Sequence, residues 1–226
     1  MQRLLFALII SIAGVAVLVS LGNWQVRRLA EKEAILAEIT ARITQPPISL
    51  PANPDPVKDK YRSVVVDGVM LPGEIHVLVS LKKVGAGYRV IAPFKTKDGR
   101  RILIDRGFIA PEDKATDRAL GAMQVAGNLH WPIEIDSYTP DPDRAGNIWF
   151  ARDVAMLAEA LKTDPILIIA KTDADSGVTP LPVDTTGIPN DHLQYAVTWY
   201  GLALVWALMS IYFLWRTRAK ARGKNS

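Results

Sequence analysis

One histidine differs from the other two because it lies directly before a long apolar segment. If a helix begins at Asn190 or Asp191, five residues recur at helical spacing on one face: His192, Tyr195, Trp199, Ala203 and Trp206. An imidazole nitrogen can ligate iron, and flat aromatic side chains can pack against a porphyrin. A haem site in a membrane helix would need such an arrangement. The alternative is that Asn190 or Asp191 caps the helix and His192 is an ordinary polar residue at a water–lipid boundary.

The remaining polar residues do not form a recognisable catalytic set. His76 falls on the polar side of a predicted strand, so we expect it to be exposed, and His130 lies beside Trp131 in another predicted strand. Asp141 and Asp143 lie in a proline-rich stretch typical of a surface loop. No G-x-S-x-G, H-E-x-x-H or Walker sequence occurs, and there is no cysteine. We therefore expect no enzyme, no thiolate metal site and no disulfide.

The charge of the chain is concentrated at its ends. The 27 Lys and Arg against 23 Asp and Glu give a net charge of +4. Arg3 and five residues after position 215 supply much of the excess, so residues 22–194 carry slightly more acidic than basic side chains. A nucleic-acid-binding domain would show a basic face in its folded body. We therefore expect no nucleic-acid partner.

Two uncharged segments predict membrane spans. The first, residues 4–21, would be roughly 27 Å long as a helix, close to the thickness of a bilayer core. It is longer than the apolar part of a cleaved signal peptide, and no small-x-small site follows it. The second, residues 195–215, has aromatic residues near both ends, as at membrane interfaces. We expect transmembrane helices over residues 4–21 and over 192–215, the latter including its interfacial start.

The flanking charges predict an orientation. Positive residues are enriched outside the two spans, in Arg3 and in the basic tail 216–226, whereas residues 175–194 contain none. The positive-inside rule then places both termini in the cytoplasm and the central region across the membrane. We expect a multi-pass protein of the bacterial inner membrane, in contact with lipid, whose main domain is periplasmic.

The sequence pattern of the central region predicts one α+β domain. Residues 22–45 continue the first helix, and Pro46 and Pro47 end it. Strands are predicted over residues 61–66, 75–81, 88–96, 101–109, 125–131 and 165–170, and a short helix is predicted after Asp153. Lys97-Asp98-Gly99 predicts a hairpin turn. The fold class is thus a membrane protein with two transmembrane helices flanking a periplasmic α+β domain, residues 46–188, with an antiparallel sheet or small barrel.

Four segments resemble the surfeit locus protein 1 family. LGNWQVRR at 21–28 with Lys32 resembles its L-G-x-W-Q-x-x-R-x-x-x-K motif, and GYRVIAPF at 87–94 resembles its G-Y-x-V-x-x-P-F motif. DRGFI at 105–109 is similar to its N-R-G-W-V motif, with Asp for Asn and Phe for Trp. NDHLQYAVTWY at 190–200 is similar to N-x-H-x-x-Y-A-x-T-W-Y.

The resemblance implies a role in cytochrome c oxidase biogenesis. Bacterial members are reported to bind haem a and are proposed to assist its insertion into oxidase subunit I. The implied partners are that subunit and a haem a synthase. The family's histidine at the start of the second span corresponds to His192. The main alternative is an assembly scaffold that stabilises an oxidase intermediate without binding haem; an enzyme acting on lipid or quinone lacks a catalytic set.

The two spans should place further residues level with His192. Trp24 and Arg28 lie at the same side of the membrane as the start of the second span. Arginine binds carboxylates through paired, charge-assisted hydrogen bonds, so Arg28, with Lys32 four residues on, is a candidate for the haem propionates. Trp24, Tyr195 and Trp199 are candidates for contact with the ring. The alternative is that the basic side chains only extend toward the membrane surface.

Overall fold

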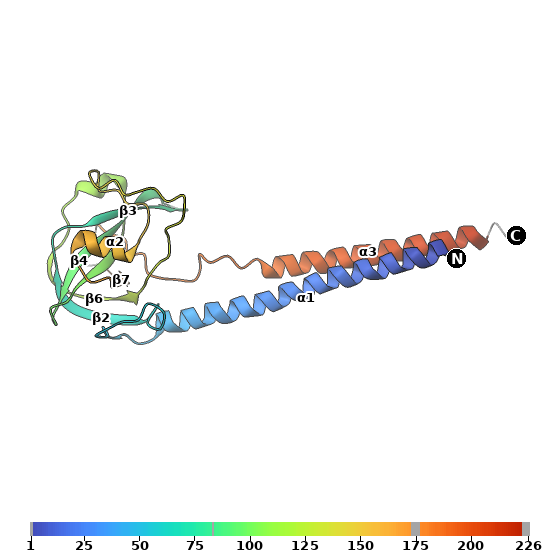
Figure 1. Ribbon diagram of the computed structural model, residues 1–226, viewed down its shortest axis with the longest axis horizontal. Helices are drawn as coiled ribbons and strands as arrows, with labels where there is room; N and C mark the ends of the chain where they lie inside the picture. The colour runs from blue at the N-terminus through green and yellow to red at the C-terminus, as the bar shows by residue number, and fades with distance from the viewer. Residues whose placement is uncertain (1, 83, 173–176, 223–226) are drawn as a thin grey trace. The chain divides into compact units, whose positions relative to one another are not determined.

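The computed structural model describes residues 2–82, 84–172 and 177–222. The chain divides into two compact units, one made of residues 1–38 and 186–226 and the other of residues 39–185. The first unit contains two long helices, and the second contains all of the strands (Figure 1).

Two long helices dominate the first unit. Helix α1 runs without a break over Gln2–Thr44, and α3 runs over His192–Arg222. Each contains a stretch that is long and apolar enough to cross a membrane. Helix α3 passes through the start of the predicted tail at 216–226, of which residues 223–226 lie outside the described part.

The second unit is built on one seven-stranded sheet. Its strands are β1 (Ile48–Ser49), β2 (Ser63–Met70), β3 (Ile75–Leu81), β4 (Gly85–Thr96), β5 (Arg101–Ile109), β6 (Gly121–Leu129) and β7 (Leu167–Ala170). A short 3-10 helix, η1 (Pro111–Ala115), and the helix α2 (Val154–Leu161) complete it. Asp153 caps α2, since its carboxylate accepts a hydrogen bond from the backbone N–H of Met156.

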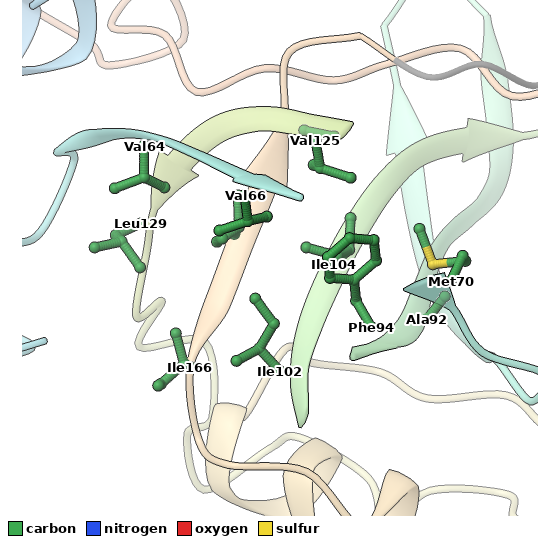
Figure 2. Close-up of a cluster of buried hydrophobic side chains, with 12 residues drawn as sticks. Val64, Val66, Met70, Ala92, Phe94, Ile102, Ile104, Val125, Leu129 and Ile166 are labelled. Atoms are coloured by element: carbon green, nitrogen blue, oxygen red, sulfur yellow. The ribbon is translucent and has the colours of Figure 1, made fainter. Parts of the chain in front are cut away.

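The sheet closes on itself as a small barrel. The strand order is β1-β2-β6-β7-β5-β4-β3, and the end of β2 also pairs with β4. Strands β2, β6, β7, β5 and β4 therefore form a closed ring, with β1 and β3 attached outside it. Apolar side chains fill its interior, among them Val64, Phe94, Ile102, Ile104 and Leu129 (Figure 2). Helix α2 contributes Leu157 to a second cluster with β3 and β5.

The expectation of an antiparallel sheet or small barrel needs one refinement. Most strand pairs are antiparallel, but β7 is parallel to β5 and β1 is parallel to β2. Strand β7 enters between β5 and β6, which run in opposite directions, so it must be parallel to one of them and antiparallel to the other. The predicted strands 75–81 and 101–109 are confirmed with their bounds, the other predicted strands recur with shifted ends, and the last of them begins at Leu167.

The expectation that His76 is exposed is wrong. Its residue surface is 4% exposed, its Nε2 lies 2.7 Å from a carboxylate oxygen of Glu74, and Asn147 lies beside Nδ1. The backbone N–H of Trp149 also bonds to the carbonyl oxygen of His76. A loop that is distant in sequence covers this end of β3, and strand alternation contains no information about such a cover.

Gly107 shows why one residue of the DRGFI segment must lack a side chain. It adopts a φ of +130°, a conformation that L-residues with a Cβ rarely adopt. A Cβ there would lie 2.2 Å from the carbonyl oxygen of Thr179, whose backbone forms two hydrogen bonds with Phe108. The glycine thus lets the segment around Thr179 pack beside β5.

Candidate functional site

Helices α1 and α3 pack as an antiparallel pair. Their partly buried positions recur in steps of three and four residues. On α1 they include Leu4, Ala7, Ser11, Gly14, Leu18 and Leu21, with Gln25 buried, and on α3 they include Trp199, Ala207, Ser210 and Leu214, with Ala196 and Ala203 buried. This spacing is typical of left-handed helix pairs. Small residues are frequent in both series, as in helix pairs that approach closely within membranes.

Two glycines of α1 lie against aromatic rings of α3. A Cβ on Gly14 would lie 2.5 Å from the indole nitrogen of Trp206, and a Cβ on Gly22 would lie 2.6 Å from the ring of Tyr200. Trp206 donates a hydrogen bond from its indole N–H to the carbonyl oxygen of Ser11 at 3.2 Å. The glycines therefore allow both rings to pack flat against α1.

His192 is hydrogen-bonded to α1 through one ring nitrogen. Its Nδ1 lies 2.8 Å from Oε1 of Gln25, which is only 7% exposed. Among the described residues, none forms a hydrogen bond with Nε2 of His192. The imidazole is half-buried at the first residue of α3, so its second nitrogen is available to a ligand.

The remaining predicted residues of α3 divide between two environments. Ala203 is buried, and Trp206 is in contact with α1. Tyr195 is 55% exposed, and Trp199 is half-buried at the edge of the helix pair. The surface next to His192 on α3 that a flat ligand could reach is therefore formed by the aromatic rings of Tyr195 and Trp199.

The structure places Trp24 and Arg28 at the height of His192. Gln25 lies between them in the sequence, and α1 rises about 1.5 Å per residue, so both lie within about one turn of the His192 contact. The ring of Trp24 is largely exposed, and Arg28 forms an exposed pair with Glu31 at 2.8 Å. An exposed pair of this kind contributes about 0–1 kcal/mol, so another carboxylate could replace Glu31 at little cost.

Sequence reasoning missed two polar residues of α1. Gln25 bonds to His192, and Asn23 accepts a hydrogen bond of 2.7 Å from the hydroxyl of Tyr200. Both precede charged residues and look like the polar end of a span. The signal for Gln25 is that it falls on the same seven-residue repeat as Ser11 and Leu18, which places it on the packed face.

A second polar cluster lies within the sheet unit. Asp105 has no exposed surface, and its Oδ2 accepts hydrogen bonds from Arg89 at 2.6 Å and from Arg152 at 3.3 Å. Arg152 also binds Glu134. Burial alone would raise the pKa of Glu134, but the hydrogen bonds and charge of Arg152 outweigh it and hold that pKa below its ordinary value.

His130 lines a cavity of about 250 Å³ next to this cluster. Its ring stacks on Tyr61 with centroids 5.3 Å apart, and its Nδ1 is buried without a hydrogen-bond partner among the described residues. Burial, with the nearby charges of Arg152 and Lys60, lowers the pKa of His130 to about 4. The imidazole is therefore neutral at neutral pH. Arg89 and Arg152 already bind the carboxylates of Asp105 and Glu134, so we interpret this polar cluster as one that stabilises the fold.

The described residues contain no group of three or more His, Asp or Glu side chains that could hold a metal ion. A metal at His192 would thus have at most two protein ligands of these types from this chain's described part. This fits an iron whose other positions are filled by a macrocycle better than a bare ion.

The chain is similar to a set of named proteins along most of its length. It is 32% identical over 212 residues to a SURF1-like protein of Rickettsia felis, covering 88% of this chain and 92% of that protein. It is 31% identical over 205 residues to surfeit locus protein 1 of Rattus norvegicus, covering 80% of this chain and 67% of that protein. The sequence model described as the SURF1 family matches residues 12–204. The chain therefore belongs to the SURF1 family.

Proposed function

We propose that the protein is a cytochrome c oxidase biogenesis factor that binds haem a through His192 and assists its insertion into oxidase subunit I. The observation that supports this most directly is the state of the His192 ring. Its Nδ1 is hydrogen-bonded to Gln25, and its Nε2 has no hydrogen-bond partner among the described residues. Family membership supports the oxidase as the target.

The first step is residence in a membrane. Along both helices, large apolar side chains such as Phe6, Ile12, Val205 and Met209 are exposed in the structure. A soluble protein rarely exposes so much contiguous apolar surface, whereas a bilayer would solvate it. The proposal places both termini in the cytoplasm and the barrel in the periplasm of a bacterial inner membrane, on the basis of the flanking Lys and Arg.

The second step is capture of the cargo at the outer end of the helix pair. Haem a supplies an iron with an open axial position, a flat apolar ring and two propionates. His192 offers Nε2 to the iron, and the rings of Tyr195 and Trp199 offer an aromatic surface at the same end of α3. We expect Trp24 to extend this surface on α1, and Arg28, which pairs with Glu31 in the structure, to bind a propionate in its place.

The third step is release. One half-buried imidazole and a few surface contacts hold a cargo less firmly than an enclosed pocket would, and a delivery protein must give up its ligand. We assign no catalytic residue. The proposed donor is a haem a synthase, and the proposed acceptor is subunit I.

An assembly scaffold is the second candidate function, and one surface of the barrel unit favours it. Ile133 is 92% exposed and Tyr138 is 89% exposed, both on the segment between β6 and α2. A contiguous exposed apolar patch is typical of a protein-binding surface, and in a scaffold these two side chains would belong to one. A scaffold of this kind would hold an oxidase intermediate without haem.

The test is the visible spectrum of the full-length protein purified after coexpression with haem a biosynthesis. The proposal predicts haem a bands in the wild type and in Tyr200→Phe, which loses only the bond to Asn23, and their loss in His192→Ala. Haem a in all three proteins would show that a residue other than His192 is the iron ligand. A folded wild-type protein without haem would favour the scaffold.

A further inference from the structure

Gln25 is a polar side chain at a buried position of a proposed membrane helix, where it needs a hydrogen-bond partner. It is almost fully buried on the face of α1 that packs against α3. Removing an amide from water without a partner costs roughly 1–3 kcal/mol in proteins. Its Oε1 lies 2.8 Å from Nδ1 of His192, so that imidazole is its partner.

The chemistry of this contact determines which nitrogen of His192 is protonated. An amide oxygen can only accept a hydrogen bond, so Nδ1 must carry the proton and donate it to Gln25. A neutral imidazole has one N–H, and Nε2 then has a free lone pair. The other tautomer would place a proton on Nε2, where it would prevent coordination.

We propose that Gln25 is a positioning residue that holds His192 in the Nδ1-protonated tautomer and fixes the direction of its ring, so that Nε2 faces an axial metal site. The inference rests on the proposed haem function for its purpose, although the tautomer itself does not need haem. Outer hydrogen bonds of this kind orient the histidine ligands of many metal sites.

The packing of α1 against α3 keeps the contact between Gln25 and His192 in register. Gly22, one turn before Gln25, allows the ring of Tyr200 to pack closely against α1. Ala196, one turn after His192, is buried at the same interface. A hydrogen bond in such a poorly hydrated place is stronger than one in water, so it can select one tautomer and one ring orientation.

Three substitutions separate positioning from packing. Gln25→Met keeps an unbranched side chain of similar length and removes the acceptor. Gln25→Glu keeps an acceptor at the same place and adds negative charge, which makes the imidazole a stronger electron donor. Asn23→Ala is the matched control, because it removes the bond to Tyr200 and leaves the Gln25–His192 contact intact.

The first measurement needs no haem. The full-length protein, labelled with nitrogen-15 in histidine and held in detergent micelles at pH 8, is examined by NMR, with His192 assigned from His192→Ala. The wild type, Gln25→Glu and Asn23→Ala should show a protonated Nδ1 and an unprotonated Nε2. Gln25→Met should show a mixture containing protonated Nε2. A wild type with protonated Nε2, or an unchanged Gln25→Met, overturns the inference.

The second measurement uses haem a added to the same proteins. Gln25→Met should bind haem a roughly 10–100-fold more weakly than the wild type, as for other changes to residues that hydrogen-bond to metal ligands. Gln25→Glu should retain binding and shift the reduction potential of the iron to a more negative value, a change that a purely structural role does not produce. Unchanged affinity and potential in both variants would overturn the inference. A wild type that binds no haem a would instead overturn the proposed function.

Discussion

The hydroxyl of Tyr200 on α3 donates a hydrogen bond of 2.7 Å to Oδ1 of Asn23 on α1, across 177 positions of sequence. Asn23 lies two residues before Gln25, which forms the contact with His192. Motifs from opposite ends of the chain therefore meet at one level of the helix pair. The family-like segments at 21–28 and 190–200 form one structural feature, and each supplies part of it.

Removing the Tyr200–Asn23 bond should weaken the helix pair by a small amount. Hydrogen bonds between membrane helices contribute about 0.6–2 kcal/mol. We expect Tyr200→Phe and Asn23→Ala to lower the free energy of unfolding in mixed micelles by that order. The double variant should lose little more than either single variant, because both remove the same bond. Fully additive losses would show that the bond does not form.

Gly22 should not tolerate a side chain. A Cβ there would lie 2.6 Å from the ring of Tyr200, whereas a Cβ on Gly201 would meet no atom within 4 Å. Gly22→Leu should separate the helices, with a loss of about 1–3 kcal/mol in the free energy of unfolding and weakened haem a binding. Gly201→Leu, the matched control, should leave both unchanged. Equal effects of the two variants would contradict the helix packing described above.

Asp105 should be important for the barrel and not for haem. Removing one member of a buried ion pair typically costs about 3–5 kcal/mol, because the remaining charges lose their partner. We expect Asp105→Ala to lower the free energy of unfolding in urea by this order, through Arg89 and Arg152. Asp141→Ala, at an exposed aspartate, should change stability by less than about 0.5 kcal/mol. A stable Asp105→Ala protein would show that the network does not support the fold.

His130 should make the barrel unit sensitive to mild acid. Its pKa is lowered from 6.5 to about 4, so the unfolded chain binds a proton in that interval and the folded chain does not. The stabilising contribution is therefore complete above pH 6.5 and is lost as the pH falls toward 4, by on the order of 3 kcal/mol. Urea unfolding followed by the fluorescence of Trp131 and Trp149 measures it. His130→Gln should lose this pH dependence; an unchanged dependence would assign it to another group.

Much of the architecture could be predicted because it follows from local pattern. The two apolar helices follow from uncharged runs, and the hairpin between β4 and β5 follows from Asp98-Gly99. The sequence leaves open whether the sheet closes into a barrel, because closure depends on the pairing of Gly68–Met70 with β4, which no local pattern encodes. The parallel position of β7 likewise depends on a crossover that contains α2.

Sequence alone identifies His192 as the candidate ligand, which stays a prediction, but it does not identify the residue that supports His192. His192 was recognisable because a polar residue directly precedes an apolar run. Gln25 was not, because its partner lies 167 positions away and only the packing of α1 on α3 brings them together. His76 was misplaced for the same reason, since the residues that bury it come from the loop around Asn147. Sequence patterns therefore misplace the residues whose partners come from distant segments of the chain.

Chemical rescue of a His192→Gly variant tests the central claim most directly. Glycine removes the imidazole and leaves a space that added imidazole can enter, next to an intact Gln25. The account predicts that full-length His192→Gly binds no haem a in micelles, and that free imidazole restores a haem a spectrum like that of the wild type. If His192→Gly retained haem a without imidazole, His192 would not be the ligand and the account would be contradicted.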